Sequence, residues 1–249
     1  MKNKEQIFNN ALKLHQTGNI KKAQNLYLEL SKNVKNNERL LLLIGTTYLQ
    51  TEKYHTAIKY LDLSIKINPN LPDSYNNRGI ALTKILNYHK SIEDYNRAIS
   101  LNKNYFDAYL NKGTSLKIIK KYKEAINCFE YCIKLKPNDS KIYNNLGNLF
   151  RELKEYKKAI HYFSKTIQLN KNFVEAYCSR GNLFEHYNQM ELAINDYENA
   201  IKLNDELDFI YGDLMHAKMH ICDWNNYEFL KKNIEKKINI NEKVIRPFS

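Results

Sequence analysis

The sequence has few of the residues that end or bend regular structure. Only seven glycines and four prolines occur among 249 residues. An all-β sandwich or barrel needs frequent turns rich in these residues, so their scarcity argues against both folds. Hydrophobic residues make up 43% of the chain, which is too much for a disordered protein. These absences leave an all-α protein as the predicted fold class.

Long apolar runs, a secretory leader and paired cysteines are also missing. The longest clean apolar run is Leu40–Ile44, whereas a membrane-spanning helix needs roughly 20 residues. The N-terminal segment lacks the apolar stretch of a signal peptide. No CxxC pair occurs among the cysteines, which are Cys128, Cys132, Cys178 and Cys222. This usage is typical of a reducing compartment, so we expect a cytoplasmic protein with no membrane contact.

Motifs of catalysis and metal binding are absent as well. The sequence holds no GxSxG, P-loop, GxGxxG or HExxH pattern. The acidic pairs Glu93–Asp94 and Asp205–Glu206 are predicted to be solvated charges on polar helix faces. His216, His220 and Cys222 could approach one metal ion, but a fourth ligand is missing. We therefore predict no catalytic residue, no cofactor and no bound metal.

Positive charge, by contrast, is in excess. The formal net charge is +12, with 33 lysines and 6 arginines. Proteins that read nucleic-acid bases favour arginine, because its guanidinium pairs bidentately. Asparagine is also abundant, with 34 copies, and an AT-rich coding sequence would enrich both asparagine and lysine. Residues 1–173 carry +16 and residues 174–207 carry −5. We interpret the acidic block as a solvated face or a local partner surface, and nucleic acid as an unlikely partner.

A period of 34 residues runs through the chain. Glycines keep it at Gly45, Gly79, Gly113, Gly147 and Gly181. Tyrosines keep it at Tyr75, Tyr109, Tyr143, Tyr177 and Tyr211. Within residues 143–172, apolar and small residues recur every three or four positions in two blocks, which predicts two antiparallel helices joined by a short turn. We expect Gly147 and Ala159 to lie where these helices cross, with Tyr143 and Phe163 at the flanks.

This pattern resembles the tetratricopeptide repeat (TPR) family, whose unit is a 34-residue helix–turn–helix. The resemblance covers six repeats, at residues 4–37, 38–71, 72–105, 106–139, 140–173 and 174–207. Residues 208–238 resemble a degenerate seventh repeat, and residues 239–249 form a tail, which we interpret as a possible start of a connector to a missing domain. The resemblance implies a right-handed α-solenoid whose concave groove, lined by the first helix of each repeat, binds protein or peptide partners.

Asparagine recurs two residues before the repeat glycine. The column consists of Asn77, Asn111 and Asn145, with Asn9 in the matching place of the first repeat. This position lies away from the packing face, toward the predicted groove, where carboxamides can pair with the backbone of an extended peptide. We add Asn148 and Asn182 to the candidate binding residues. The column is interrupted at Leu43 and Ser179, and the abundance of asparagine is the competing explanation.

A narrower resemblance concerns the end of the chain. The Asn-x-Gly column is similar to the repeats of the O-GlcNAc transferase and SPINDLY family, whose asparagine ladder holds peptide substrates. Residues 213–230 and 245–249 resemble the connector to the glycosyltransferase domain of bacterial SPINDLY-like enzymes. Cys222, Asp223, Trp224, Pro247 and Phe248 carry that match. The resemblance implies the substrate-recruiting arm of a glycosyltransferase, which is the alternative to a free-standing protein-interaction scaffold. An RNA-binding helical repeat is the third hypothesis. The oligomeric state is left open.

Overall fold

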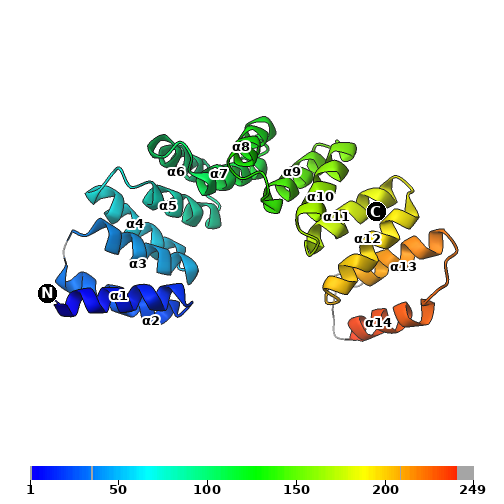
Figure 1. Cartoon of the computed structure of the whole chain (residues 1–249), viewed down its shortest axis with the longest axis horizontal. Coiled ribbons are helices and arrows are strands. Elements are labelled where there is room, and N and C mark those ends of the chain that lie inside the picture. The colour runs from blue at the N-terminus through cyan, green and yellow to red at the C-terminus, as the bar shows by residue number, and fades with distance from the viewer. Residues whose placement is uncertain (1, 35, 208, 240–249) are drawn as a thin grey trace. The chain divides into compact units, whose positions relative to one another are not determined.

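The computed structural model describes residues 2–34, 36–207 and 209–239, and these ranges contain fourteen α-helices and no strand (Figure 1). The helices are α1 (Lys2–Gln16), α2 (Ile20–Asn33), α3 (Glu38–Gln50), α4 (Tyr54–Ile67), α5 (Pro72–Lys84), α6 (Tyr88–Leu101), α7 (Phe106–Ile118), α8 (Tyr122–Leu135), α9 (Ser140–Glu152), α10 (Tyr156–Leu169), α11 (Val174–His186), α12 (Met190–Leu203), α13 (Ile210–His220) and α14 (Tyr227–Asn239). In these ranges no helix has the length and apolarity to cross a membrane.

The chain forms two compact units, Met1–Pro137 and Asn138–Ser249. The first contains α1 to α8 and the second contains α9 to α14. Within each unit every helix packs against the next one along the chain, so each unit is a stack of helical hairpins. The predicted fold class, an all-α solenoid of helix–turn–helix repeats, is confirmed. The tail prediction falls, apart from Asn239, outside the described residues.

The glycine column is explained by the crossing of the two helices in a hairpin. A Cβ atom added to Gly147 would lie 2.6 Å from Cε1 of Phe163, and one added to Gly79 would lie 2.6 Å from Cε1 of Tyr95. Both rings are essentially inaccessible to solvent. The crossing predicted at Gly147 is therefore present, but Phe163 fills the crossing itself rather than its flank. The residue sixteen positions after the glycine excludes a side chain there; it is Leu61 for Gly45 and an aromatic residue for the later glycines.

Each hairpin turns through one residue in the left-handed region. The glycine at this place in the first hairpin, Gly18, has φ +78°, and every later hairpin uses another residue type there. These residues are Glu52, Leu86, Lys120, Lys154, Asn188 and Cys222, with φ between 55° and 63°. The following amide donates back to the carbonyl five residues earlier, as in Asn87 N to Leu82 O at 2.8 Å. This bond satisfies a carbonyl that the helix end leaves unpaired. The pair α13 and α14 turns in the same way.

Candidate functional site

Two members of the predicted asparagine column join the first helices of neighbouring hairpins. Asn77 on α5 donates its Nδ2 hydrogen to Thr46 Oγ1 on α3 over 2.9 Å. Asn111 on α7 donates to Asn76 Oδ1 on α5 over 3.2 Å. Asn76 in turn donates to Asn77 Oδ1 over 3.3 Å. These carboxamides therefore form one hydrogen-bonded chain along α3, α5 and α7, and all of it lies in the first unit.

The other candidate asparagines, two from the column and two added to it, take no part in these hydrogen bonds. Asn9 is exposed on α1, while Asn145 and Asn148 are half-buried on α9. No hydrogen bond links these three side chains to another residue in the described part of the chain. Asn182 on α11 has a different partner, because its Oδ1 accepts from the Tyr197 hydroxyl over 2.8 Å. Among the described residues, hydrogen bonds thus link Asn77 and Asn111 through Asn76 and join none of the other four candidates to them.

The interruption of the column at Ser179 leaves an unsatisfied group. The carboxamide oxygen of Asn144 is buried and has no hydrogen-bond partner among the described residues. In the first unit the corresponding oxygen, on Asn76, accepts from Asn111, which lies 35 positions later. The residue 35 positions after Asn144 is Ser179, whose hydroxyl is too short to replace a carboxamide and accepts from Arg151 over 3.4 Å. The missing donor therefore explains the orphaned oxygen.

A shallow cavity of about 510 Å³ in the second unit is lined in part by Asn182. Its lining includes Glu185 and His186 from α11 with His216 and His220 from α13. Glu185 organises this cavity, because Oε1 lies 2.7 Å from His216 Nδ1 and Oε2 accepts from the Tyr197 hydroxyl over 2.6 Å. The cavity thus offers imidazole and carboxamide groups to a polar ligand.

The chain offers no complete metal centre within the described residues. No group of three His, Cys, Asp or Glu side chains is placed there to hold an ion. His216 and His220 do lie together on α13, with ring centroids 4.6 Å apart. Cys222, the third residue considered from the sequence, is exposed in the turn that follows.

The prediction that Asp94 is a solvated charge is wrong. Asp94 is buried, and both its carboxylate oxygens accept from Arg78, over 2.8 Å from Nε and 2.6 Å from Nη2. Arg78 also contacts Asp62 of the preceding hairpin at 2.6 Å. Burial raises the pKa of the Asp94 carboxyl, and the hydrogen bonds from Arg78 oppose that rise. This pair could not be predicted from local sequence, because the partners lie sixteen positions apart on different helices.

A second ion pair repeats this arrangement in the second unit. Arg180 donates to both oxygens of Asp196, over 2.8 Å from Nε and 2.7 Å from Nη2, and reaches Ser164 of the preceding hairpin over 2.9 Å. Burial raises the pKa of Asp196, against the hydrogen bonds from Arg180. Both pairs are internal to their hairpin stacks and saturated by their partners. They contribute to hairpin packing and are not candidates for catalysis.

Comparison with known proteins agrees with this architecture. A family model described as tetratricopeptide repeat matches residues 72–105, 106–139 and 140–173, and a second model of the same description matches residues 38–71 and 174–206. Together the matches cover more than half of the chain. No curated protein sequence matches.

Solved structures show the same fold at low sequence identity. PilF of Pseudomonas aeruginosa superposes with a TM-score of 0.72 and 18% identity, over 82% of this chain and 91% of that one. The C-terminal part of a TPR repeat-containing protein from Cytophaga hutchinsonii gives 0.69 and 20%, over 94% and 95% of the two chains. YrrB, described as a TPR protein with an unusual peptide-binding site, gives 0.60 and 14%, over 78% and 97%. With the family models and the 34-residue hairpins taken together, the chain belongs to the tetratricopeptide repeat family.

Proposed function

We propose that this chain is a scaffold that binds extended segments of partner proteins along the face formed by its first helices. Protein binding is typical of its family. The observation that carries the peptide mode is the hydrogen-bonded chain of Asn76, Asn77 and Asn111. It holds the carboxamides of two consecutive first helices, α5 and α7, in fixed orientations and links them to the Thr46 hydroxyl on α3. Preorganised donors and acceptors lose less entropy on binding than mobile ones.

Asn111 has the donor and acceptor that such a mode needs. One Nδ2 hydrogen is used by Asn76, and Oδ1 has no hydrogen-bond partner in the described part of the chain. A carboxamide can accept at Oδ1 and donate a second Nδ2 hydrogen. Asn111 can therefore pair with both an amide N–H and a carbonyl of a peptide backbone, irrespective of the peptide's side chains. Asn77 and Asn111 belong to the first unit, so we place the proposed contact there.

The experiment uses a peptide selected on the intact chain from a displayed library. We expect Asn111→Ala to weaken binding of that peptide about tenfold, because one or two hydrogen bonds amount to roughly 1–1.5 kcal/mol. Asn127→Ala is the matched control, since Asn127 is exposed on the second helix α8 of the same hairpin. Equal affinity of the Asn111→Ala variant and the wild type would refute the proposal.

A salt titration separates the protein-binding hypothesis from RNA binding. Contacts through neutral carboxamides change little with ionic strength, whereas binding to phosphates falls linearly on a log–log plot. We expect a shallow slope for the selected peptide and only weak, steeply salt-dependent association with single-stranded RNA. Tight RNA binding that survives physiological salt would favour the helical-repeat RNA-binding alternative.

The glycosyltransferase-arm hypothesis rests on the sequence resemblance at residues 213–230, which the comparisons above do not confirm. Part of that resemblance, Pro247 and Phe248, lies outside the described residues. The deciding measurement is the intact mass of the native protein from its own cells. A mass near 29.6 kDa would favour the scaffold, and a mass larger by a catalytic domain would favour the substrate-recruiting arm.

A further inference from the structure

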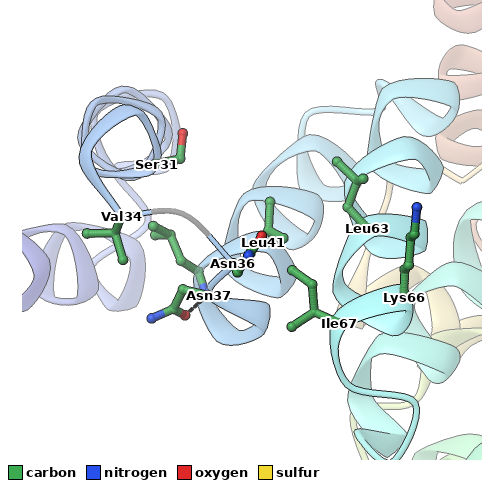
Figure 2. Close-up of a pocket in the computed structure, with 9 residues that line it drawn as sticks. Ser31, Val34, Asn36, Asn37, Leu41, Leu63, Lys66 and Ile67 are labelled. Carbon is green, nitrogen blue, oxygen red and sulfur yellow. Dashed lines mark hydrogen bonds between the residues drawn. The ribbon is translucent and has the colours of Figure 1, made fainter.

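A cavity of about 580 Å³ opens in the first unit, between the end of α2, the start of α3 and the end of α4. This volume is within the range of ligand pockets, roughly 300–1,000 Å³. Its walls are mainly apolar: Figure 2 shows Val34 on one side, Leu63 and Ile67 on the other, and Leu41 between them. Leu63 is 48% exposed and Ile67 is 37% exposed. We call this cavity the first-unit pocket. None of its lining residues belongs to the asparagine column.

The pocket exists because, in the hairpin of α3 and α4, smaller residues replace two large side chains of the repeat pattern. Leu41 stands in the register position that tyrosine holds at Tyr75, Tyr109, Tyr143, Tyr177 and Tyr211. Asn37 stands in a position whose later members are Leu71, Tyr105, Asp139, Phe173 and Leu207. Asn37 is exposed, and its side chain accepts from the Leu40 amide over 2.8 Å as the cap of α3. The chain has a helix cap here where most hairpins have apolar bulk.

The next two hairpins show what occupies the equivalent space. In the hairpin of α5 and α6, the Tyr75 ring lies 5.8 Å from the Arg97 guanidinium. In the hairpin of α7 and α8, the Tyr109 and Tyr131 ring centroids are 4.3 Å apart. Arg97 and Tyr131 hold the register position of Leu63. An aromatic ring therefore fills the gap between first and second helix in both of these hairpins.

The charge of this part of the chain indicates which residues would flank such a ring in a partner protein. Residues 1–71 contain eleven basic and five acidic side chains, a formal charge of +6. Lys66 lines the pocket itself. An acidic segment is attracted to this surface, and a basic one is repelled.

We infer that the first-unit pocket binds an aromatic side chain carried by an acidic segment of a partner protein. The ring would insert between Leu41 and Leu63 and supply the packing that Tyr109 supplies two hairpins further on. Its acidic neighbours would face Lys66 at the rim. This contact is separate from the peptide-binding face proposed above, because it involves the ends of α2 and α4 rather than the asparagine column.

The test uses the intact chain and three synthetic peptides: DEDFDED, DEDADED and KRKFKRK. Methyl resonances of Val34, Leu41, Leu63 and Ile67 are followed by NMR during each titration. We expect DEDFDED to shift these methyl signals and to bind at least tenfold more tightly than the other two peptides. Equal binding of DEDFDED and DEDADED would overturn the inference, as it would show an electrostatic association with no ring insertion. Equal binding of KRKFKRK would refute the acidic partner.

Two variants restore residues that other hairpins use. The double variant Leu41→Tyr/Asn37→Leu fills the pocket with the chain's own pattern and should weaken DEDFDED at least tenfold without lowering the melting temperature. Leu63→Asn introduces the residue that a later hairpin has at the same position, Asn199. Because Leu63 is partly exposed, this variant provides an independent test if the filled variant folds poorly. Binding that survives either change at wild-type strength would place the peptide elsewhere and overturn the inference.

Two charge-reversal variants and one variant of the proposed peptide-binding face serve as further controls. Lys66→Glu should weaken DEDFDED several-fold, while Lys202→Glu, at the equivalent place in the second unit, should not. Equal effects of the two substitutions would show that net charge alone governs binding. Asn111→Ala should leave DEDFDED unaffected, which keeps this result independent of the proposed peptide-binding face.

Discussion

Replacement of Gly147 by leucine tests the physical reason for the 34-residue glycine column. The added Cβ would meet Phe163 at 2.6 Å from Cε1 and 2.7 Å from Cδ1. Real Cβ atoms do not approach other carbons so closely, and Phe163 is fully buried, so its ring has no free space into which to move. The two helices α9 and α10 must therefore separate, or the ring must leave its position.

The expected loss is the difference of two opposing contributions. Overpacking of a filled core costs roughly 3 kcal/mol at the upper end of the usual range. Leucine favours the helix over glycine by about 1 kcal/mol. The net loss in the free energy of unfolding is then about 2 kcal/mol, which corresponds to a melting temperature about 4–8 °C lower for a chain of this size.

Thermal melting followed by circular dichroism measures this loss, with Asn127→Leu as a surface control. The double variant Gly147→Leu/Phe163→Ala gives the sharper test. Phe163→Ala alone costs about 3–5 kcal/mol through the cavity it leaves. Leucine at 147 fills part of that cavity, so the double variant should be less destabilised than the sum of the single variants by at least about 1 kcal/mol. An unchanged melting temperature for Gly147→Leu, or strict additivity in the double variant, would refute the assignment of this contact.

Three further predictions concern the ion pairs and the turns. Arg180→Leu should cost about 3–5 kcal/mol, because it leaves Asp196 buried without its partner. The double variant Arg180→Leu/Asp196→Tyr copies an apolar pair of another hairpin and should recover most of that loss; thermal melts that show no recovery would contradict this. Leu86→Gly should raise the melting temperature by a few degrees. Relief of the strained left-handed conformation gains roughly 1–2 kcal/mol, which exceeds the entropic cost of glycine, about 0.5–1 kcal/mol. A lower melting temperature would show that the Leu86 side chain stabilises the turn. The hydrogen bond from Lys218 lowers the pKa of Asp223 below its ordinary 3.8. The stabilising contribution of the Asp223 carboxylate is therefore present above pH 3.8 and is lost as the pH falls through the lowered pKa. The melting temperatures of wild type and Asp223→Asn should converge as the pH is lowered below 3.8, and a constant difference between them would exclude the contribution.

The periodicity of the sequence predicts the helices well because both helices of a hairpin bury one face at fixed spacing. Gly147 is part of that period, so the crossing at this residue could be predicted, whereas Phe163 was expected at the flank of the crossing and fills it instead. The burial of Asp94 could not be predicted, because the position carries aspartate in some hairpins and other residues elsewhere. The left-handed turn at Leu86 has no local residue signal; only its 34-residue register with Gly18 indicates it.

The position of two candidate residues could be predicted from the sequence, and their role in binding stays a prediction. The period places Asn77 and Asn111 on one column, and they do take part in one hydrogen-bonded chain. Asn76, which links them, was not predicted, because its slot holds Leu110 in the next hairpin. Whether a carboxamide bridges two helices depends on its rotamer and on the spacing of those helices, and neither can be read from residue order.

The repeats also show how a departure from the pattern can be interpreted. Arg78 with Asp94, and Arg180 with Asp196, occupy slots that Leu146 and Tyr162 hold in the hairpin of α9 and α10. Those slots tolerate either chemistry because each pair fills the space and satisfies its own polar groups.

The first-unit pocket is different, because the smaller side chains at positions 37 and 41 are not balanced by larger neighbours. Leu63 is 48% exposed beside these two positions. A departure that the chain compensates internally is explained by packing alone. One that leaves apolar surface uncovered, beside a lysine and on a strongly basic segment, provides a place where a second molecule can complete the packing. Loss of peptide binding in the filled variant is the result that would establish this role.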